Sequence, residues 1–513
     1  MANKKSRFLR FLDWVERIAD KLPDPFFLFM FLAAIILIIS WIASAYNAYV
    51  IHPGTGEKAY VINLLNAEGI RRMFTELVKN FIEFPPLGVV LAALIGIGVA
   101  DKSGLFSAAM RKLVYIVPKW ALTFTLIFVS VNSNFIGDAG LVIMPAMGAL
   151  LFASVGRHPI AGLTAAFAGV CGGFSANMFI TILDPLLSGF THAAAQMLDE
   201  SYQVFPTANY YFMIVSTFLI SFVGTFVNRK FVEPRLGKWK PQKVEIKGEN
   251  EELLSENNFH NLTKTENKGL IFSGITFLVL IAILSLMVIP ENGILRDSDG
   301  GLMPFYHSII AMIIIIFLIP GTVFGITTGS IKRSADLAKM MTSTMGAMGA
   351  YLILAFAAGQ FVAYFKWSNL GIVTAVQGAN FLKGIGLENI PLIVAFLTFS
   401  AIMNIFIYSA SAKWAILSPV FVPMLMILGY TPEMTQLIYR VGDSITNMIT
   451  PLLPYFPIVI AFAKKYDKDI SFGKLISNLM PYSIAFYIVW TIFLVIWMLI
   501  DLPIGPGAGI SIN

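Results

Sequence analysis

Five ionisable side chains lie inside otherwise apolar stretches of the sequence: Asp138, Asp184, Lys413, Arg440 and Asp443. A charged side chain at the centre of a membrane-spanning helix costs roughly 2.5–3.5 kcal/mol on insertion scales. Each of these residues therefore needs an oppositely charged partner or a function, such as binding an ion or a charged ligand. They are the first candidates for chemistry in this chain.

Asp184 and Arg440 have the most specific surroundings. Asp184 precedes Pro185, which has no N–H donor and so leaves a backbone carbonyl free nearby. A carboxylate beside free carbonyls suits a cation or a proton, although Asp184 could instead face water at the outer end of its segment. Arg440 has no basic neighbour in its segment. Its guanidinium fits either the carboxylate of a ligand or a buried carboxylate of the chain.

Oxygen-bearing side chains gather near the same places. Hard cations such as sodium prefer oxygen ligands, but the same oxygens could satisfy backbone groups at helix ends, and aspartate is a common helix N-cap. Trp414 follows Lys413 and could stack on an aromatic ligand or simply pack in the core. We predict these ion-binding candidates: Asn134, Asp138, Ser175, Asn177, Ser409, Asp443, Ser444 and Asn447.

The composition defines the elements that must position these residues. The chain has 513 residues, of which 57% are hydrophobic and 13% are charged, and its mean hydropathy is +0.76. Soluble domains carry about 25% charged residues, so a soluble chain of this composition could not cover its surface. We predict an all-α polytopic membrane protein. The net charge of +6 fits basic cytoplasmic loops rather than nucleic-acid binding.

Hydropathy predicts about nine crossings in two membrane halves, 26–228 and 269–513. Residues 1–25 are expected to form a cytoplasmic interfacial helix, and 229–268 a charged cytoplasmic linker. Basic residues place the N-terminus in the cytoplasm and the C-terminus outside. The expected crossings are 26–46, 84–100, 159–190, 208–228, 269–290, 307–320, 341–364, 434–463 and 476–500.

Two regions differ from ordinary crossings. Residues 118–153 and 389–428 each contain two short apolar arms around a polar tip, which predicts re-entrant hairpins. Each precedes a broken crossing, 159–190 or 434–463, that contains Asn-Met followed by Pro-Leu-Leu. The first crossing is expected to break at residues 172–177 and at Asp184-Pro185, and the second at residues 442–447 and at Pro451 and Pro454. The predicted orientation makes the two regions an inverted repeat. Interrupted segments at corresponding positions of two halves are typical of secondary transporters, with sodium possible at the hairpin tips and helix breaks.

Other function classes find less support. The five histidines lack metal-ligand spacing, and no phosphate-binding glycine loop appears, so neither an enzyme, a cofactor nor ATP coupling is expected. A dicarboxylate or citrate carrier of related architecture, an intramembrane enzyme and a channel stay as alternatives.

Four segments resemble the AbgT family of p-aminobenzoyl-glutamate transporters: FLDWVERIADKLPDPFFLF, GDAG, GGFSANMFITILDPLLSG and YRVGDSITNMITPLLPYFP. The resemblance implies nine spans and two hairpins in a homodimer of the inner (cytoplasmic) membrane. It also implies a small-molecule substrate, a sodium or proton gradient, and either uptake of p-aminobenzoyl-glutamate or efflux of sulfonamides. The site residues it implies are Asp184, Asn404, Ser411, Trp414, Pro432 and Arg440.

Overall fold

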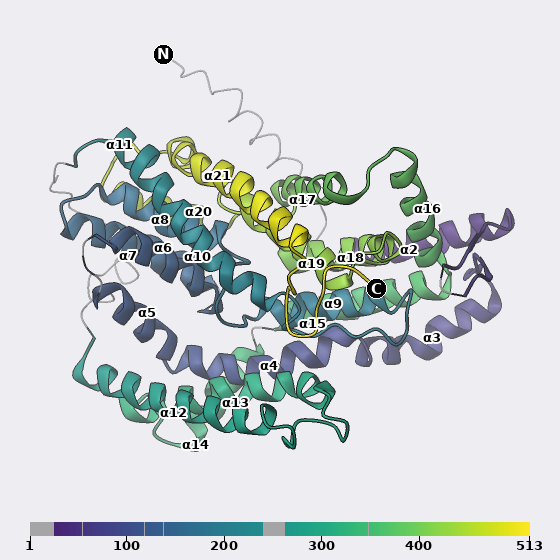
Figure 1. Cartoon of the computed structure of the whole chain (residues 1–513), viewed down its shortest axis with the longest axis horizontal. Helices are drawn as coiled ribbons and strands as arrows, with labels where there is room; N and C mark the ends of the chain where they lie inside the picture. The colour runs from purple at the N-terminus through teal and green to yellow at the C-terminus, as the bar shows by residue number, and fades with distance from the viewer. Residues whose placement is uncertain are drawn as a thin grey trace, which may run out of the picture.

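The computed structural model describes residues 25–239 and 262–512, apart from single positions 54, 117, 119, 137 and 347. Long helices dominate (Figure 1). The one sheet among these residues is a small antiparallel ribbon of β1 (Tyr49–Ile51) and β2 (Lys58–Tyr60). The predicted interfacial helix lies outside the described residues except for its last position.

Nine helices in the described part of the chain are long and apolar enough to cross a membrane. They are α2 (Pro25–Ala45); α3 and α4 (Ala67–Ile82, Pro85–Lys102); α10 with η2 and α11 (Tyr210–Val227, Asn228–Val232, Glu233–Leu236); α12 (Lys264–Val288); α13 (Met303–Thr328); α15 (Gly349–Trp367); α17 (Asn389–Phe406); α18 (Ala410–Ile427); and α21 (Phe472–Leu499). The number matches the prediction but the membership differs, because α17 and α18 qualify singly and the broken crossings do not.

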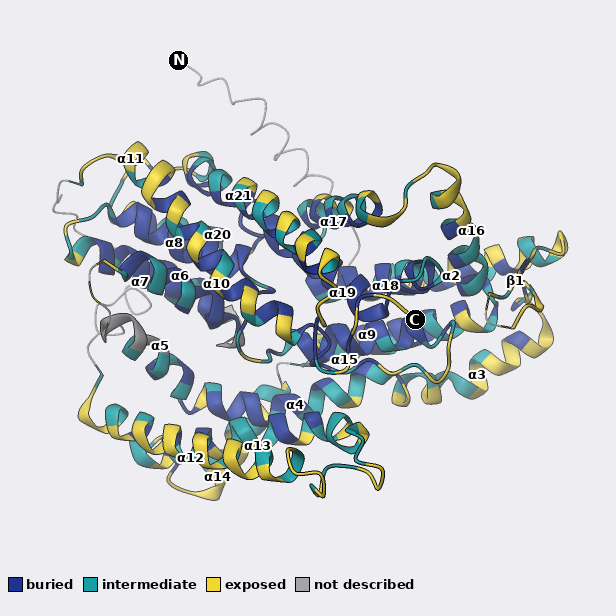
Figure 2. Ribbon diagram, viewed as in Figure 1, coloured by how far each residue is buried: buried dark blue, intermediate teal, exposed yellow. Residues whose placement is uncertain are grey.

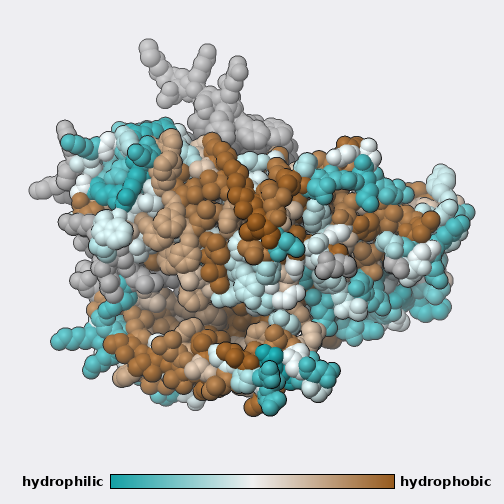
Figure 3. All heavy atoms as spheres, in the orientation of Figure 1, coloured by the Kyte–Doolittle hydropathy of each residue, from teal (hydrophilic) through white to brown (hydrophobic). Residues whose placement is uncertain are grey.

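The outer helices present apolar side chains to their surroundings. Ile484, Ile488, Ile492 and Ile496 recur every fourth residue along α21 and are each about half exposed. Almost none of α12 is buried, although it is strongly apolar. Figure 3 shows this apolar surface over α12 and α21. A helix that is apolar on its exposed side is a membrane-facing helix, which supports the predicted class.

Several predicted boundaries were wrong. Residues 229–236 continue the helix of α10 through η2 and α11, and α12 already begins at Lys264 behind the N-cap Thr263. Both ends of the predicted linker are therefore helical. The basic residues at these two ends lie on helices that continue beyond their apolar parts. Hydropathy alone assigns such polar helix ends to a loop. The predicted crossing 341–364 is split between α14 (Ser334–Gly346) and α15.

Two pairs of helices occupy the predicted hairpin regions. The first pair is α6 (Leu122–Asn132) and α7 (Asp138–Ser154), joined by η1 (Ser133–Ile136), and the second is α17 and α18. Their re-entrant placement and the inverted repeat stay predictions. Two further helices are α5 (Leu105–Ile116) and α16 (Leu370–Gly384).

Both predicted broken crossings are interrupted. Residues 173–182 separate α8 (Pro159–Gly172) from α9 (Leu183–Ala195), and residues 447–455 separate α19 (Pro432–Thr446) from α20 (Phe456–Lys464). The second break was expected to begin at Gly442, which is helical instead. A Cβ at Gly442 would lie 2.8 Å from Ser400 Cβ, so this glycine permits α19 to pack closely on α17.

The interrupted helices form the centre of the molecule. Every residue of α8 and of α19 is buried, and Figure 2 shows both as dark helices inside the bundle. Because α19 carries many polar residues, its burial requires hydrogen-bonding or ionic partners for each of them. The polar candidates of the sequence are therefore held at the core rather than at the surface.

We expect Gly148→Ala to lower the thermal unfolding midpoint, because α7 and α8 touch through glycines. A Cβ at Gly148 would lie 2.8 Å from the Gly162 carbonyl carbon and 2.9 Å from Ala166 Cβ. Overpacking of this kind costs about 1–3 kcal/mol. The matched control is Gly274→Ala on α12, where a Cβ meets nothing within 4 Å. Equal midpoints for the two variants in detergent would contradict the close contact.

Candidate functional site

Asp184 and Arg440 form a buried ion pair that joins the two halves of the chain. Arg440 Nη1 donates to Asp184 Oδ1 over 2.6 Å, and both side chains are 1% exposed. The other oxygen, Asp184 Oδ2, accepts from the backbone N–H of Thr181 at 2.6 Å and from its hydroxyl at 2.8 Å. Of the alternatives for Arg440, the carboxylate partner within the chain is the one observed, and Asp184 does not face water.

Asp184 lies where a carboxylate is favoured. It is in the first turn of α9, where free N–H groups and the helix dipole stabilise negative charge. Pro185 follows in the same turn, where its missing N–H breaks no helical hydrogen bond. The break therefore precedes Asp184-Pro185 rather than following from it.

Arg440 retains unused hydrogen-bonding capacity. Its Nε and Nη2 atoms are buried and make no hydrogen bond to any described residue. Leaving a buried donor unpaired costs about 1–3 kcal/mol, and more for a charged group. Because Asp184 uses only one arm of the guanidinium, the other N–H groups could bind a second carboxylate.

Lys413 and Asp443 form a second buried ion pair, with side chains 0% and 1% exposed. Lys413 Nζ also donates to Asn404 Oδ1 at 2.6 Å and to the Ile407 carbonyl at 3.3 Å. Asn404 Nδ2 in turn donates to the backbone oxygen of Asp443 and to Asn447 Oδ1. Asn404, Asp443 and Asn447 were predicted separately, and the structure brings them together around this lysine.

Trp414 is completely buried and already stacked. Its ring lies on that of Tyr439, with centroids 4.4 Å apart and planes at 24°. Its Nε1 donates to the Thr191 hydroxyl, which donates to Gln436 Oε1. In this conformation Trp414 ties α18 to α9 and α19, and its stacking partner is a residue of the chain.

Pro432 begins α19 at the first helical position, where its missing N–H is harmless. Thr431 caps the helix by accepting a hydrogen bond from the N–H of Met434 at 3.1 Å. Pro432 thus sets the start of the helix that carries Arg440 and Asp443.

A small cavity of about 190 Å³ lies where the helix pairs meet the helix breaks. It collects three predicted residues, Ser409, Ser411 and Asn447, whereas Asp184 and Arg440 are not among its lining residues. Leu183, the neighbour of Asp184, does line it. The remaining lining residues are Leu141, Cys171, Phe174, Tyr408, Ala410 and Leu453.

The first half contributes oxygens that lack partners. Ser175 Oγ and Asn177 Oδ1 are buried and make no hydrogen bond to the described residues. Asn134 donates to the carbonyls of Val131 and Val170, which is backbone satisfaction at a helix end. Ser444 Oγ accepts from Ser175 N and donates to the Arg440 carbonyl, linking both halves. The side chain of Asp138 lies outside the described residues.

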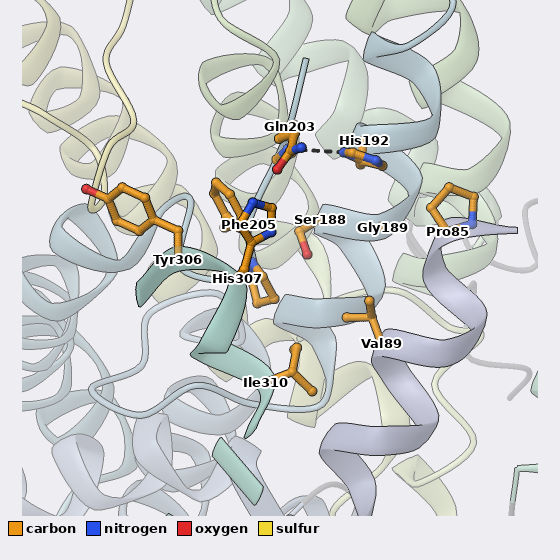
Figure 4. A pocket seen from close by; sticks show the side chains of 12 residues that line it. Pro85, Val89, Ser188, Gly189, His192, Gln203, Phe205, Tyr306, His307 and Ile310 are labelled. Atoms are coloured by element: carbon orange, nitrogen blue, oxygen red, sulfur yellow. Dashed lines mark hydrogen bonds between the residues drawn. The ribbon is translucent and has the colours of Figure 1, made fainter. Parts of the chain in front are cut away.

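A larger cavity of about 350 Å³ lies beyond Asp184 along α9 (Figure 4). Ser188 and His192 line it one and two turns further along this helix, facing Phe205, Tyr306 and His307. Its wall is mostly apolar and aromatic, with few polar groups, which is the usual character of a small-molecule site.

The sequence missed Glu433, a buried acid that accepts a hydrogen bond from the Tyr202 hydroxyl at 2.9 Å. The predicted crossing began at residue 434, so this acid fell just outside the apolar window. The search for charges inside crossings would have found it with a boundary one residue earlier. The sequence also missed Thr191 and Tyr439, which carry no charge and are identified only by their contacts with Trp414.

Long apolar helices that enclose two interrupted helices, joined to each other by the buried ion pair of Asp184 and Arg440, define a multi-pass membrane transporter. Comparison with known proteins agrees. Residues 10–512 match the model of the "AbgT putative transporter family". The chain belongs to the AbgT family.

Its relatives cover almost the whole chain. It is 39% identical over 497 residues to the p-aminobenzoyl-glutamate transport protein of Escherichia coli (strain K12), covering 96% of each chain. The Alcanivorax borkumensis YdaH transporter is 39% identical, with a TM-score of 0.87 over 94% of this chain and all of that one. Neisseria gonorrhoeae MtrF, described among antimetabolite efflux pumps, is 42% identical, with a TM-score of 0.90 over 97% of this chain and all of that one.

We expect Arg440→Gln to lower the unfolding midpoint strongly, because it leaves the Asp184 carboxylate buried without its cation. Removing one partner of a buried pair costs about 3–5 kcal/mol. The double variant Asp184→Asn/Arg440→Gln removes both charges and should unfold at a higher temperature than Arg440→Gln. Thermal unfolding of the purified proteins measures this. A double variant no more stable than Arg440→Gln would contradict an energetically coupled pair.

Proposed function

We propose that this protein is a secondary active transporter of aromatic organic acids similar to p-aminobenzoyl-glutamate, or an exporter of sulfonamide antimetabolites, driven by a sodium or proton gradient. The names of its relatives support both substrate classes. It would act as a homodimer in the inner membrane, with its N-terminus in the cytoplasm and its C-terminus outside.

The proposal rests on the unpaired N–H groups of the Arg440 guanidinium. One arm pairs with Asp184, while Nε and Nη2 are buried without a hydrogen bond among the described residues. The carboxylate of an organic acid would supply the missing acceptors in the geometry that guanidinium prefers. Arg440 is therefore assigned to the acidic group of the substrate.

Substrate binding is coupled to ion binding if the substrate and Asp184 compete for Arg440. A substrate carboxylate that draws the guanidinium away leaves Asp184 as an uncompensated buried charge, which is costly. Binding a proton or a sodium ion at Asp184 removes that cost. Substrate and coupling ion would then favour each other's binding, and each would carry the same coupling free energy.

The alternatives differ in what the site must accept. Both p-aminobenzoyl-glutamate and a dicarboxylate or citrate substrate carry two or more carboxylates, so the free N–H groups of Arg440 do not separate these alternatives. The aromatic ring does, because it suits the aromatic lining of the larger cavity, where Phe205, Tyr306 and His307 meet. An intramembrane enzyme would release a chemically altered product, and a channel would pass current without coupling.

We expect Asp184→Asn protein in liposomes to lose flux of radiolabelled p-aminobenzoyl-glutamate driven by a sodium or pH gradient, with the two gradients imposed separately. The amide keeps the size of the side chain but cannot bind the coupling ion as an anion. The matched control is Asp299→Asn on the exposed loop before α13, which should transport normally. Unchanged gradient-driven flux in folded Asp184→Asn protein would rule out this role.

We expect Arg440→Lys to keep the fold but weaken substrate binding about 10- to 100-fold. Lysine retains the charge and one bond to Asp184 but not the planar fork, and a charge-assisted hydrogen bond is worth about 1.5–3 kcal/mol. The half-saturating concentration for transport measures the effect. An unchanged value would mean that Arg440 serves Asp184 alone.

A further inference from the structure

The ammonium group of Lys413 has three hydrogen-bond donors, and three oxygens of the second half take them up. They are the Asp443 carboxylate, Asn404 Oδ1 at 2.6 Å and the Ile407 carbonyl at 3.3 Å. The group is fully satisfied, since a lysine ammonium donates three hydrogen bonds. These oxygens come from the end of α17, the residue that follows it, and α19, where the sequence predicted an ion site.

The position of Lys413 is unfavourable on two counts. Its side chain is 0% exposed, so the charge has lost its hydration. It also lies on the fourth residue of α18, close to the positive end of the helix dipole, where a cation is disfavoured. An ordinary core helix would carry an apolar residue there. The favourable contribution that offsets this position comes from the three oxygens that the ammonium contacts.

One carboxylate, one amide oxygen and one carbonyl oxygen are the kinds of ligand that a hard monovalent cation takes in a protein. We propose that Lys413 is a tethered cation: its ammonium fills the cation position of the second half, so that sodium does not bind there. The charge that a diffusible ion would bring to Asp443 is instead fixed to the chain.

The first half contrasts with this arrangement. At its break, Ser175 Oγ and Asn177 Oδ1 are buried without hydrogen bonds among the described residues, and the carboxylate of Asp184 is paired with an arginine of the other half. Two halves that look similar in sequence thus differ chemically. The second half holds its cation permanently, whereas the buried Ser175 Oγ and Asn177 Oδ1 at the break of the first half are free to receive an exchangeable one.

This proposal rests on the proposed function, because the number of ion sites matters only in a carrier that is coupled to a cation. Its test does not involve the substrate, however. Lys413→Ala removes the ammonium, opens the space it filled and leaves the three oxygens with the net negative charge of Asp443. Sodium should then bind where it does not bind in the natural protein.

The experiment measures binding of radioactive sodium to the purified full-length protein, together with the unfolding midpoint in sodium chloride and in choline chloride. We expect Lys413→Ala to bind one sodium ion more per chain than the unaltered protein and to gain a larger sodium-dependent rise in midpoint, because a ligand that binds only the folded state stabilises it. Lys413→Met should gain neither, because its apolar chain refills the space. Lys464→Ala, which removes an exposed lysine on α20, is the matched control.

The double variant Lys413→Ala/Asp443→Asn separates a gained ion site from general loosening. It retains the opened space but has no carboxylate, so the additional sodium should disappear. A folded Lys413→Ala protein with the sodium response of the unaltered protein would overturn the proposal. So would a Lys413→Ala protein that fails to fold in sodium while the double variant folds, since sodium would then be unable to replace the ammonium. Loss of transport without either result bears on the proposed function only.

Discussion

The ion pair between Asp184 and Arg440 is the constraint on which the rest of the site depends. It connects residues 256 positions apart, in helices that belong to different halves of the chain. Two charges that leave water need close, well-directed contact to repay their lost hydration. The short N–H···O contact and the two bonds from Thr181 supply it. Because the chain is not helical before α9, the N–H and hydroxyl groups of Thr181 are free to donate to the Asp184 carboxylate.

The sequence predicted the fold class, and it identified charged residues that the structure buries, because a charge inside a membrane-spanning segment costs free energy. Apolar runs and charges within them are visible without any coordinates, and they revealed Asp184, Lys413, Arg440 and Asp443. Pairing was not predictable, because hydropathy does not say which charges meet. Glu433 was missed at a boundary, and Gly442 was taken for a break although it permits close packing. The error at Gly442 concerns contact between helices, which a single segment does not encode.

The two interrupted regions are alike in sequence pattern and unlike in chemistry. Both have an Asn-Met pair in the break and a proline near the start of the crossing. Yet the carboxylate in the first region pairs with an arginine from the other half, whereas the carboxylate in the second pairs with a lysine from its own half. Similar sequence patterns can therefore place their carboxylates in different partnerships, one across the two halves and one within the second half.

Both ion pairs meet on α19, and this limits how the protein can move. Arg440 holds α19 to α9, while Asp443, one turn further along, holds it to Lys413 of α18. Trp414 reinforces the arrangement by stacking on Tyr439 and bonding to Thr191 of α9. Sliding any one of these three helices past the others would break a buried pair at about 3–5 kcal/mol. A rearrangement that keeps both pairs intact is therefore cheapest when α9, α18 and α19 move as one body.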